Sequence, residues 1–420
     1  MLMQSRCGSP DTIPIPTSMQ IFTVGGAVRD TLLGLPVKDR DYVVVGATPE
    51  QMVALGYTPV GKDFPVFLHP VTHEEYALAR TERKTAPGYR GFVFHADGAV
   101  TLEQDLMRRD LTINAMALSE DGVLVDPFNG RADLEQRLFR HVSDAFVEDP
   151  VRILRLARFA ARFTDFTVAA STNALMQRMV AAGEVDALVP ERVWQELARG
   201  LMETQPSRMF DVLRECGALI RLLPEIEHAF AVQSSDEGTK IRARCMRSID
   251  QAAQQNFTLP IRFTALLCTL EAIESVSPID PIQQRQQIEA LATRLKIPNE
   301  CRDLAVMCAR ELACIDQSAS LDAIALVGLI ERCDGIRKPD RFLDMLRVVE
   351  CTQLAQSSGS ALPTTRLLAK ILTAARAVDG GAIAVRCKQN PAEIAQHIRH
   401  ARIDAVNIAI ATIRAADATH

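Results

Sequence analysis

The stretch from Ile21 to Val45, which reads IFTVGGAVRDTLLGLPVKDRDYVVV, constrains this chain more than any other. An apolar run leads into Gly25 and Gly26, which open a short helical pattern that a later glycine and proline end. Asp39 and Asp41 then stand at the head of a β-branched run, where residues two apart in a strand point to one face. The pattern predicts a strand, a glycine turn, a helix and a second strand with both acids on one side.

These residue types are suited to phosphate chemistry. The free N–H groups of a helix that follows a glycine turn can hold an anion. Mg²⁺ is usually held by one or two carboxylates together with substrate phosphates. The two features together favour Mg²⁺-dependent phosphoryl transfer, whereas each alone is also typical of a plain turn or a solvated strand end. The Walker motif and the G-x-G-x-x-G motif are excluded, because the spacing and the Lys-Ser/Thr pair are missing.

Composition limits the class of protein. With 420 residues, 48% hydrophobic and 24% charged, the chain is globular and long enough for two or more cores. No apolar run reaches the roughly 20 residues of a membrane span, and residues 1–18 have the pattern of a loose extension and not of a signal peptide. Ten cysteines without a C-x-x-C pair indicate reduced thiols, so we expect a cytoplasmic protein without a membrane partner. A net charge of -5 means that a nucleic-acid partner would need local basic patches.

Residues 19–140 mix strand and helix patterns. A helix is predicted over 48–55, capped by Thr48, and a strand pair over 57–67 and 72–79. Glu75 in the second strand is a candidate third carboxylate beside the aspartates, although a rim acid on an exposed strand is nearly as good an interpretation. The basic run over 80–91 contains Pro and Gly residues and predicts a mobile loop.

Two clusters of arginine follow. The segment 102–118, LEQDLMRRDLTINAMAL, contains an Arg-Arg-Asp triplet. The segment 147–163, VEDPVRILRLARFAARF, predicts a helix with arginines on one broad face at positions 152, 155, 158 and 162. Such a stripe needs either a bound anion or acids from elsewhere in the protein opposite it, and both interpretations stay open.

These motifs together resemble the tRNA nucleotidyltransferase and poly(A) polymerase family, in the branch of bacterial CCA-adding enzymes. GGAVRD with DRDYVV is similar to its catalytic signature, RRDLTINA to its second motif and EDPVR to its base-recognition motif. The resemblance implies an α+β protein, with an N-terminal mixed α/β, polymerase-β-like nucleotidyltransferase head followed by an all-helical neck, body and tail. We expect the head at 19–140, the neck at 141–205, and a tRNA-binding body and tail at 206–420.

The resemblance also implies the site residues. Asp39 and Asp41 are expected to be catalytic and to hold two Mg²⁺ ions roughly 3.5–4 Å apart. Glu75 is expected to be catalytic with them, on the strand alternation described above. Asp110 is expected to bind the ribose 2′-hydroxyl, which would select ribonucleotides. The residues expected to bind nucleotide are Gly26, Arg29, Arg109, Asp110, Asp149, Arg152, Arg155 and Arg158.

The implied base template has a chemical rationale. Cytosine and adenine both present an amino group beside a bare ring nitrogen, whereas uracil and guanine present a carbonyl beside N–H. The Asp149 carboxylate can accept from the amino group, and the Arg152 guanidinium can donate to the ring nitrogen. UTP or GTP would leave desolvated polar groups mismatched, at about 1–3 kcal/mol per group. The expected reaction is addition of C, C and A to the tRNA 3′ end from CTP and ATP, with no DNA partner.

Three other functions stay open. A poly(A) polymerase shares the head. After the aspartate pair, however, that branch of the family typically has a glycine, two basic residues and Phe, and this chain has Asp63 in place of the second basic residue. An enzyme adding only C or only A, and an inactive tRNA-binding protein, are the others. Glu191, Arg192 and Glu196 are expected to form structural charge pairs with Trp194 packed beneath.

The second half departs from many relatives. A His-Asp metal site that confers phosphohydrolase activity in them aligns with Cys268 and Thr269 here, so we expect no such activity. Arg386, Lys388, Arg399 and Arg402 form either a surface for the tRNA elbow or an ordinary solvated face.

Overall fold

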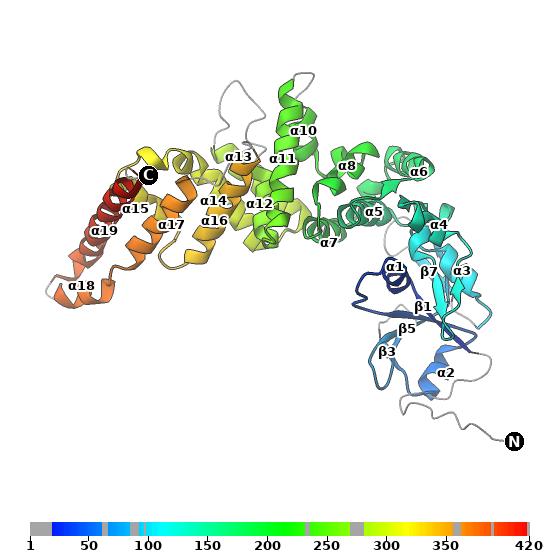
Figure 1. The fold of residues 1–420 in the computed structure, drawn as a ribbon. Coiled ribbons are helices and arrows are strands. Elements are labelled where there is room, and N and C mark those ends of the chain that lie inside the picture. The colour runs from blue at the N-terminus through cyan, green and yellow to red at the C-terminus, as the bar shows by residue number, and fades with distance from the viewer. Residues whose placement is uncertain are drawn as a thin grey trace. The chain divides into compact units, whose positions relative to one another are not determined.

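The computed structural model describes residues 19–60, 66–84, 92–95, 98–231, 236–268, 281–355, 363–387 and 390–417 (Figure 1). The expected loose extension over 1–18 lies outside the described residues, as do 85–91 of the expected basic loop. The chain divides into two compact units. The first comprises Met1–Leu156, Asp165–Leu188 and Glu215–Arg221, and the second comprises Ala157–Thr164, Val189–Arg214 and Leu222–His420.

The first unit is built on a seven-stranded mixed sheet with the strand order β3-β4-β5-β2-β1-β8-β9. Its strands are β1 (Gln20–Val24), β2 (Asp41–Val45), β3 (Thr58–Val60), β4 (Val66–Leu68), β5 (Glu75–Leu78), β8 (Ala117–Ser119) and β9 (Leu124–Val125). Central strand β2 pairs antiparallel with β1 and parallel with β5. Two small sheets join β6 (Thr81–Lys84) to β7 (Phe92–His95) and β10 (Leu138–Phe139) to β11 (Thr167–Val168).

The two faces of the large sheet carry separate cores, because residues alternate between them along each strand. Val44 and Tyr76 belong to one core, which includes Met52 of the helix α2 (Pro49–Ala54). Val43 and Ala79 belong to the other core, which includes Leu106 of α3 (Leu102–Met107), Ala115 and Ala117. Helix α3 therefore covers the sheet face to which alternate residues of β2 and β5 point.

Helices make up most of the remaining chain. Up to Ala231 they are α1 (Gly26–Leu32), α4 (Gly130–Glu135), α5 (Val151–Arg162), α6 (Ala170–Ala181), α7 (Pro190–Leu201), α8 (Ser207–Glu215), α9 (Ala218–Leu222) and α10 (Pro224–Ala231). Beyond it lie α11 (Asp236–Gln254), α12 (Leu259–Cys268), α13 (Pro281–Leu295), α14 (Asn299–Asp316), α15 (Ala323–Arg332), α16 (Pro339–Leu354), α17 (Pro363–Arg376), α18 (Gly380–Arg386) and α19 (Ile394–Asp417). Short 3-10 helices include η1 (Thr112–Asn114) and η2 (Asp144–Glu148).

The predicted fold class is confirmed: a mixed α/β sheet domain comes first, and the described residues after β11 hold helices and turns with no strand. The predicted helix start at Thr48 is also confirmed. Its hydroxyl accepts from the Gln51 N–H, and the Gln51 side chain accepts from the Thr48 N–H at 2.8 Å. Within the predicted basic loop, Thr81–Lys84 instead forms strand β6.

Among the described residues, no helix combines the length and the apolar character that crossing a membrane requires. The predicted division into a head, a neck, and a body and tail stays a prediction.

Candidate functional site

Two of the three predicted carboxylates, Asp41 and Glu75, lie at the start of central strands. Asp41 is the first residue of β2 and is in register with Glu75, the first residue of the parallel strand β5. Register partners on neighbouring strands project to the same face, so these two exposed acids point the same way. Asp39 lies before β2, in a segment without regular structure, so the strand alternation that we expected to orient it does not reach it.

The carboxylates fit a divalent ion in number and in chemistry. No group of three or more His, Cys, Asp or Glu residues within the described part of the chain could hold a metal ion. Asp41 and Glu75 are nevertheless register partners that both carry carboxylate oxygens, and Mg²⁺ usually takes only one or two carboxylates beside substrate phosphates. Both acids lie on the face that α3 covers. Asp41 is two residues from Val43 and Glu75 is four residues from Ala79, and these two residues belong to the same core as Leu106 of α3.

The glycine turn lies between β1 and α1. Gly25 has a φ of 68°, and a Cβ there would come 2.9 Å from Nη1 of Arg109, so this position requires glycine. Its N–H donates to the carbonyl of Met116 at 3.3 Å, which ties the turn to the segment after the Arg-Arg-Asp triplet. Gly26 begins α1, and a Cβ there would be only in ordinary contact with Arg29 at 3.5 Å.

Arg29, which we expected to bind nucleotide, is buried with 3% exposure. Its Nε donates to Asp30 at 2.8 Å, and its Nη1 donates to Oδ1 of Asn114 at 2.6 Å. The structure therefore places this guanidinium within the protein, between α1 and η1.

The Arg-Arg pair is held by an acid that the sequence did not single out. Asp105 of α3 is fully buried and accepts from Nη2 of Arg108 at 2.7 Å and from Nη2 of Arg109 at 3.2 Å. Burial opposes ionisation of Asp105, but the two guanidinium charges hold its pKa below the ordinary value. Arg109 also approaches the carbonyl of Asn114 with Nη1 at 3.5 Å.

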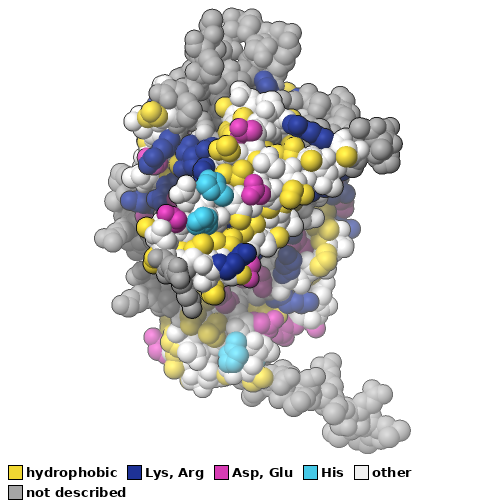
Figure 2. All heavy atoms as spheres, turned by 90° about the vertical axis from the view of Figure 1, so that its left-hand side faces the viewer, with side chains coloured by type: hydrophobic (Ala, Val, Ile, Leu, Met, Phe, Trp, Pro, Cys, Tyr) yellow, Lys and Arg dark blue, Asp and Glu magenta, His cyan; other side chains and the backbone are white. Residues whose placement is uncertain are grey.

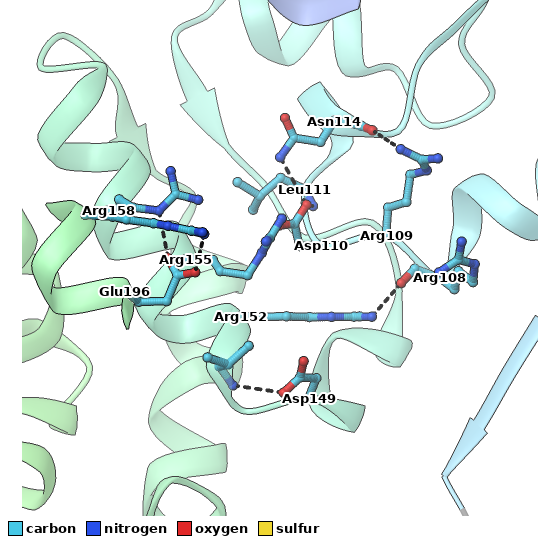
Figure 3. A network of polar contacts seen from close by, with 12 residues as sticks. Arg108, Arg109, Asp110, Leu111, Asn114, Asp149, Arg152, Arg155, Arg158 and Glu196 are labelled. Atoms are coloured by element: carbon cyan, nitrogen blue, oxygen red, sulfur yellow. Dashed lines mark hydrogen bonds and ion pairs between the residues drawn. The ribbon is translucent and has the colours of Figure 1, made fainter. Parts of the chain in front are cut away.

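Asp110 accepts hydrogen bonds at both of its carboxylate oxygens (Figure 3). Its Oδ1 accepts from the Leu111 N–H at 2.8 Å and from Nδ2 of Asn114 at 3.0 Å, and its Oδ2 accepts from Nε of Arg155 at 2.9 Å. Burial opposes ionisation, but the Arg155 charge and the Asn114 hydrogen bond hold the pKa of Asp110 well below its ordinary value. Asp110 is thus a fixed carboxylate at pH 7.

The predicted base-reading pair lies at the start of α5. The Asp149 carboxylate accepts from the Val151 N–H at 3.2 Å. Arg152 is buried, and its guanidinium donates to the carbonyl of Ala145 at 2.7 Å and to the carbonyl of Arg108 at 2.6 Å. The structure therefore brings Arg152 and the Arg-Arg-Asp triplet into contact (Figure 3). The reading of a base by Asp149 and Arg152 stays a prediction.

The arginine stripe of α5 meets acids from elsewhere in the chain. Arg155 pairs with Asp110 and keeps 39% of its side chain exposed. Arg158 pairs with Glu196 of α7 at 2.7 Å, with only 12% of its side chain exposed. The interpretation of acids opposite the stripe therefore holds for these two arginines.

Glu196 has the structural role predicted for it, because it also lies 3.7 Å from Arg199. Trp194 of α7 packs edge-on against Phe263 of α12, with ring centroids 5.4 Å apart, so the two helices are in contact at this position.

The C-terminal basic residues differ in their surroundings. Arg399 pairs with Glu331 at 3.1 Å, and Arg386 is exposed. Lys388 lies outside the described residues. Thr269, which aligns with part of the His-Asp metal site of relatives, also lies outside them. Cys268 is buried at the end of α12. Figure 2, which presents the left-hand side of Figure 1, shows basic side chains gathered near one edge of that face, with hydrophobic side chains exposed across its middle.

Sequence reasoning missed Asp105, Asn114 and the strict need for glycine at position 25. Asn114 lies within the segment RRDLTINA, so its nearness to the triplet was a usable signal. The contacts of Asn114 with Arg29, which is 85 positions away in the chain, were not visible in the sequence.

Two family models match this chain. Residues 21–140 match the poly A polymerase head domain, and residues 165–230 match the probable RNA and SrmB-binding site of polymerase A. A Herminiimonas arsenicoxydans protein named "Multifunctional CCA protein" is 58% identical over 413 residues, which cover 94% of this chain and 99% of that protein. The protein of the same name from Janthinobacterium sp. (strain Marseille) is 57% identical over 411 residues, covering 93% of this chain and 98% of that protein.

Solved structures share the fold. The crystal structure of the Bacillus stearothermophilus CCA-adding enzyme in complex with CTP has a TM-score of 0.64 at 22% identity, covering 93% of this chain and 89% of that chain. The Thermotoga maritima CCA-adding enzyme complexed with tRNA has a TM-score of 0.63 at 20% identity, covering 94% of this chain and 92% of that chain.

Proposed function

Since this chain belongs to the family of bacterial CCA-adding nucleotidyltransferases, we propose a role in the family's reaction for its individual residues. It is an enzyme that adds the 3′-terminal CCA of tRNA from CTP and ATP with release of pyrophosphate. Its family implies a divalent metal ion, for which we propose Mg²⁺. The substrates make the cytoplasm the expected location.

The observation that carries the residue assignment is the contact network around Asp110, which joins α1, the Arg-Arg-Asp triplet and α5. The glycine turn lies beside this network, because a Cβ on Gly25 would come 2.9 Å from Nη1 of Arg109 and 3.9 Å from the carbonyl oxygen of Asn114. We assign Asp110 to the ribose 2′-hydroxyl, because a carboxylate that stays ionised accepts a hydrogen bond from a hydroxyl that deoxyribose lacks. We assign Arg109 to the nucleotide phosphates, since its guanidinium is only partly buried beside that turn.

Asp39, Asp41 and Glu75 are the acids that we assign to the metal and to the primer end. When bound, the ion lowers the pKa of the primer 3′-hydroxyl and neutralises charge on the pyrophosphate. The protein then has to orient the hydroxyl and the α-phosphate in line, since phosphoryl transfer depends mostly on positioning and charge. Asp41 and Glu75 are suited to this, because both extend from central strands of a sheet and not from a loop.

Asp149 and Arg152 are assigned to the base edge, and Arg155 to the triphosphate. Arg155 is half exposed, so it can exchange its bond with Asp110 for one with a phosphate while α5 stays in place. Arg158 would have to leave Glu196 to reach a phosphate. We therefore propose that its main contribution is to hold α5 against α7.

The test uses purified full-length protein, a tRNA transcript that ends at the discriminator base, and Mg²⁺. We expect two added nucleotides with CTP alone, three with CTP and ATP together, and none beyond the third. Unlimited addition of A would identify a poly(A) polymerase. Addition of C without A, or of A only to a tRNA ending in CC, would identify an enzyme with half the activity. No pyrophosphate release would identify an inactive tRNA-binding protein.

The same assay tests the acids. Asp39→Ala and Asp41→Ala should each lower incorporation by about 1,000-fold or more, because several kcal/mol of transition-state stabilisation are lost. Binding of tRNA in a filter assay should persist. Asp121→Ala changes an exposed acid in the turn between β8 and β9 of the same sheet and serves as the matched control. Incorporation near the wild-type rate by either site variant would remove these residues from the reaction.

A further inference from the structure

Asn114 joins two charged groups that lie far apart in the sequence, the guanidinium of Arg29 and the carboxylate of Asp110. It is buried, with 6% exposure, in η1. Its side-chain oxygen accepts from Nη1 of Arg29 at 2.6 Å, and its side-chain nitrogen donates to Oδ1 of Asp110 at 3.0 Å. A path of hydrogen bonds therefore runs from Asp30 through Arg29 and Asn114 to Asp110.

The partners of Asn114 fix the orientation of its amide. A guanidinium has donors only, and an ionised carboxylate has acceptors only. The amide oxygen must therefore face Arg29 and the amide nitrogen must face Asp110, because the reversed orientation would oppose like groups at both ends. A side chain with one acceptor and one donor on a short, planar end is required here, which explains the choice of asparagine.

Asp110 would lose part of its orientation without this bond. Oδ1 would retain only the N–H of the adjacent residue Leu111, and Oδ2 would retain Arg155, whose side chain is 39% exposed. Arg29 would likewise keep Asp30, its sequence neighbour, but lose a partner on the other element. Asn114 is thus the buried link, set by tertiary structure, that positions the carboxylate relative to α1.

We propose that Asn114 is a positioning residue that holds the Asp110 carboxylate in place for the nucleotide ribose. This inference rests on the proposed function, in which Asp110 contacts the 2′-hydroxyl. Asn114 itself contacts no substrate in this scheme. Its loss lowers the preference of the enzyme for ribonucleotides over deoxyribonucleotides, because a carboxylate that rotates away contributes less to binding of the hydroxyl.

The experiment compares kcat/KM for CTP with kcat/KM for dCTP, using full-length protein and tRNA that ends at the discriminator base. Asn114→Ala should lower this CTP preference by about tenfold or more, as expected for loss of a hydrogen bond to a charged group. Asp110→Asn should lower the same ratio at least as far. Asn114→Asp keeps the acceptor for Arg29 but turns an oxygen toward Asp110, so it should lower the ratio as well.

Thr112→Val is the matched control. Thr112 lies in the same 3-10 helix, is equally buried, and donates to Asp133 at 2.7 Å, a contact that does not include Asp110. This variant should lose thermal stability and keep the wild-type ratio. A ratio that falls for Asn114→Ala but not for Thr112→Val separates positioning from a general loss of structure.

The outcomes are distinguishable. If the wild-type protein adds no C to tRNA, the proposed function is wrong. If Asp110→Asn keeps the wild-type ratio while C is added, Asp110 does not read the 2′-hydroxyl and the inference about Asn114 falls with it. If only Asp110→Asn changes the ratio, Asn114 does not position Asp110. Failure of both Asn114 variants to fold would assign the residue to folding and overturn the proposal.

Discussion

The side chain of Arg152 is buried, and we propose that it also reads the base of the nucleotide. Its guanidinium satisfies the carbonyls of Ala145 and Arg108, so its replacement leaves two acceptors without their donor. We expect Arg152→Ala to relax selection, so that UTP or GTP competes with CTP, and also to lower the melting temperature. Competition assays with all four nucleotides measure the first effect, and calorimetry measures the second. Unchanged discrimination in a folded variant would show that the base is read by other residues.

The buried aspartates of the site predict a pH dependence of stability. The pKa of Asp110 and that of Asp105 are held below their ordinary values in the folded protein. Their charged forms therefore stabilise the fold above about pH 4, the range of an unfolded aspartate, and this contribution is lost as the pH falls through the folded pKa. We expect the melting temperature to drop on acidification below that point.

Asp110→Asn isolates the contribution of one group. At pH 7 the variant should melt below the wild type, because Arg155 loses its charged partner. Below pH 4 the difference should shrink, since the unfolded wild-type chain takes up a proton at Asp110 that the folded protein, with its lowered pKa, does not bind. Calorimetry from pH 7 to pH 3 measures both proteins, and a gap that stays constant over this range would contradict the assignment of an ionised Asp110.

At the scale of elements, the close approach of α4 to η1 holds the Arg-Arg-Asp segment in place. Gly130 begins α4, and a Cβ there would overlap the Thr112 carbonyl oxygen and lie 2.8 Å from its carbonyl carbon. The Asp126 carboxylate accepts from the Gly130 N–H at 2.7 Å and fixes the start of the helix. A backbone atom cannot move aside as a flexible side chain can, so this contact needs glycine.

Gly130→Ala should therefore destabilise the first unit by about 2 kcal/mol or more, as overpacking in a tight core does. Gly98→Ala is the control, because the nearest atom to a Cβ there is 3.8 Å away in ordinary contact. Calorimetry of both variants gives the comparison. Equal melting temperatures for the two would show that α4 shifts at no cost.

Helix α5 shows how one element serves several purposes. Its buried residues Ile153, Leu154 and Leu156 pack into the core, while its arginines bond to a carbonyl pair, to Asp110 and to Glu196 in turn. Because Arg152, Arg155 and Arg158 have different partners, their equal spacing of three residues does not give them equal surroundings.

Across the molecule, most of the described cysteines are buried among the helices. Burial raises the pKa of Cys216 to about 11 and that of Cys301, Cys333 and Cys351 to about 12. A thiol with such a pKa is hardly ionised at pH 8 and reacts slowly. Among the nine described cysteines, only Cys314 and Cys387 are partly exposed.

We therefore expect a variant with Cys7, Cys314 and Cys387 replaced by Ser to react slowly with Ellman's reagent at pH 8. Cys7 lies outside the described residues and is replaced to remove its contribution. The seven remaining thiols should react at once after unfolding in guanidinium chloride. Rapid reaction in the native state would show that the helical core opens often, and the wild type provides the reference rate.

From the sequence alone came the strand, glycine turn, helix and second strand of residues 21–45, the helix start at Thr48, Asp41 at the head of β2, and the family. These features are local, because alternation, caps and short motifs depend on neighbours along the chain. Glu75 was placed beside the aspartates from alternation alone, and the register of β5 with β2 agrees for Asp41.

The partners of the charged residues, by contrast, follow from how the folded chain packs. The sequence left open whether the α5 stripe faces an anion or acids, and folding brings Asp110 to Arg155 from 45 positions away and Glu196 to Arg158 from 38. It also buried Arg29 against Asn114 and left Asp39 outside the strand. Long-range pairing depends on how whole elements pack, and spacing along the chain carries no record of that packing.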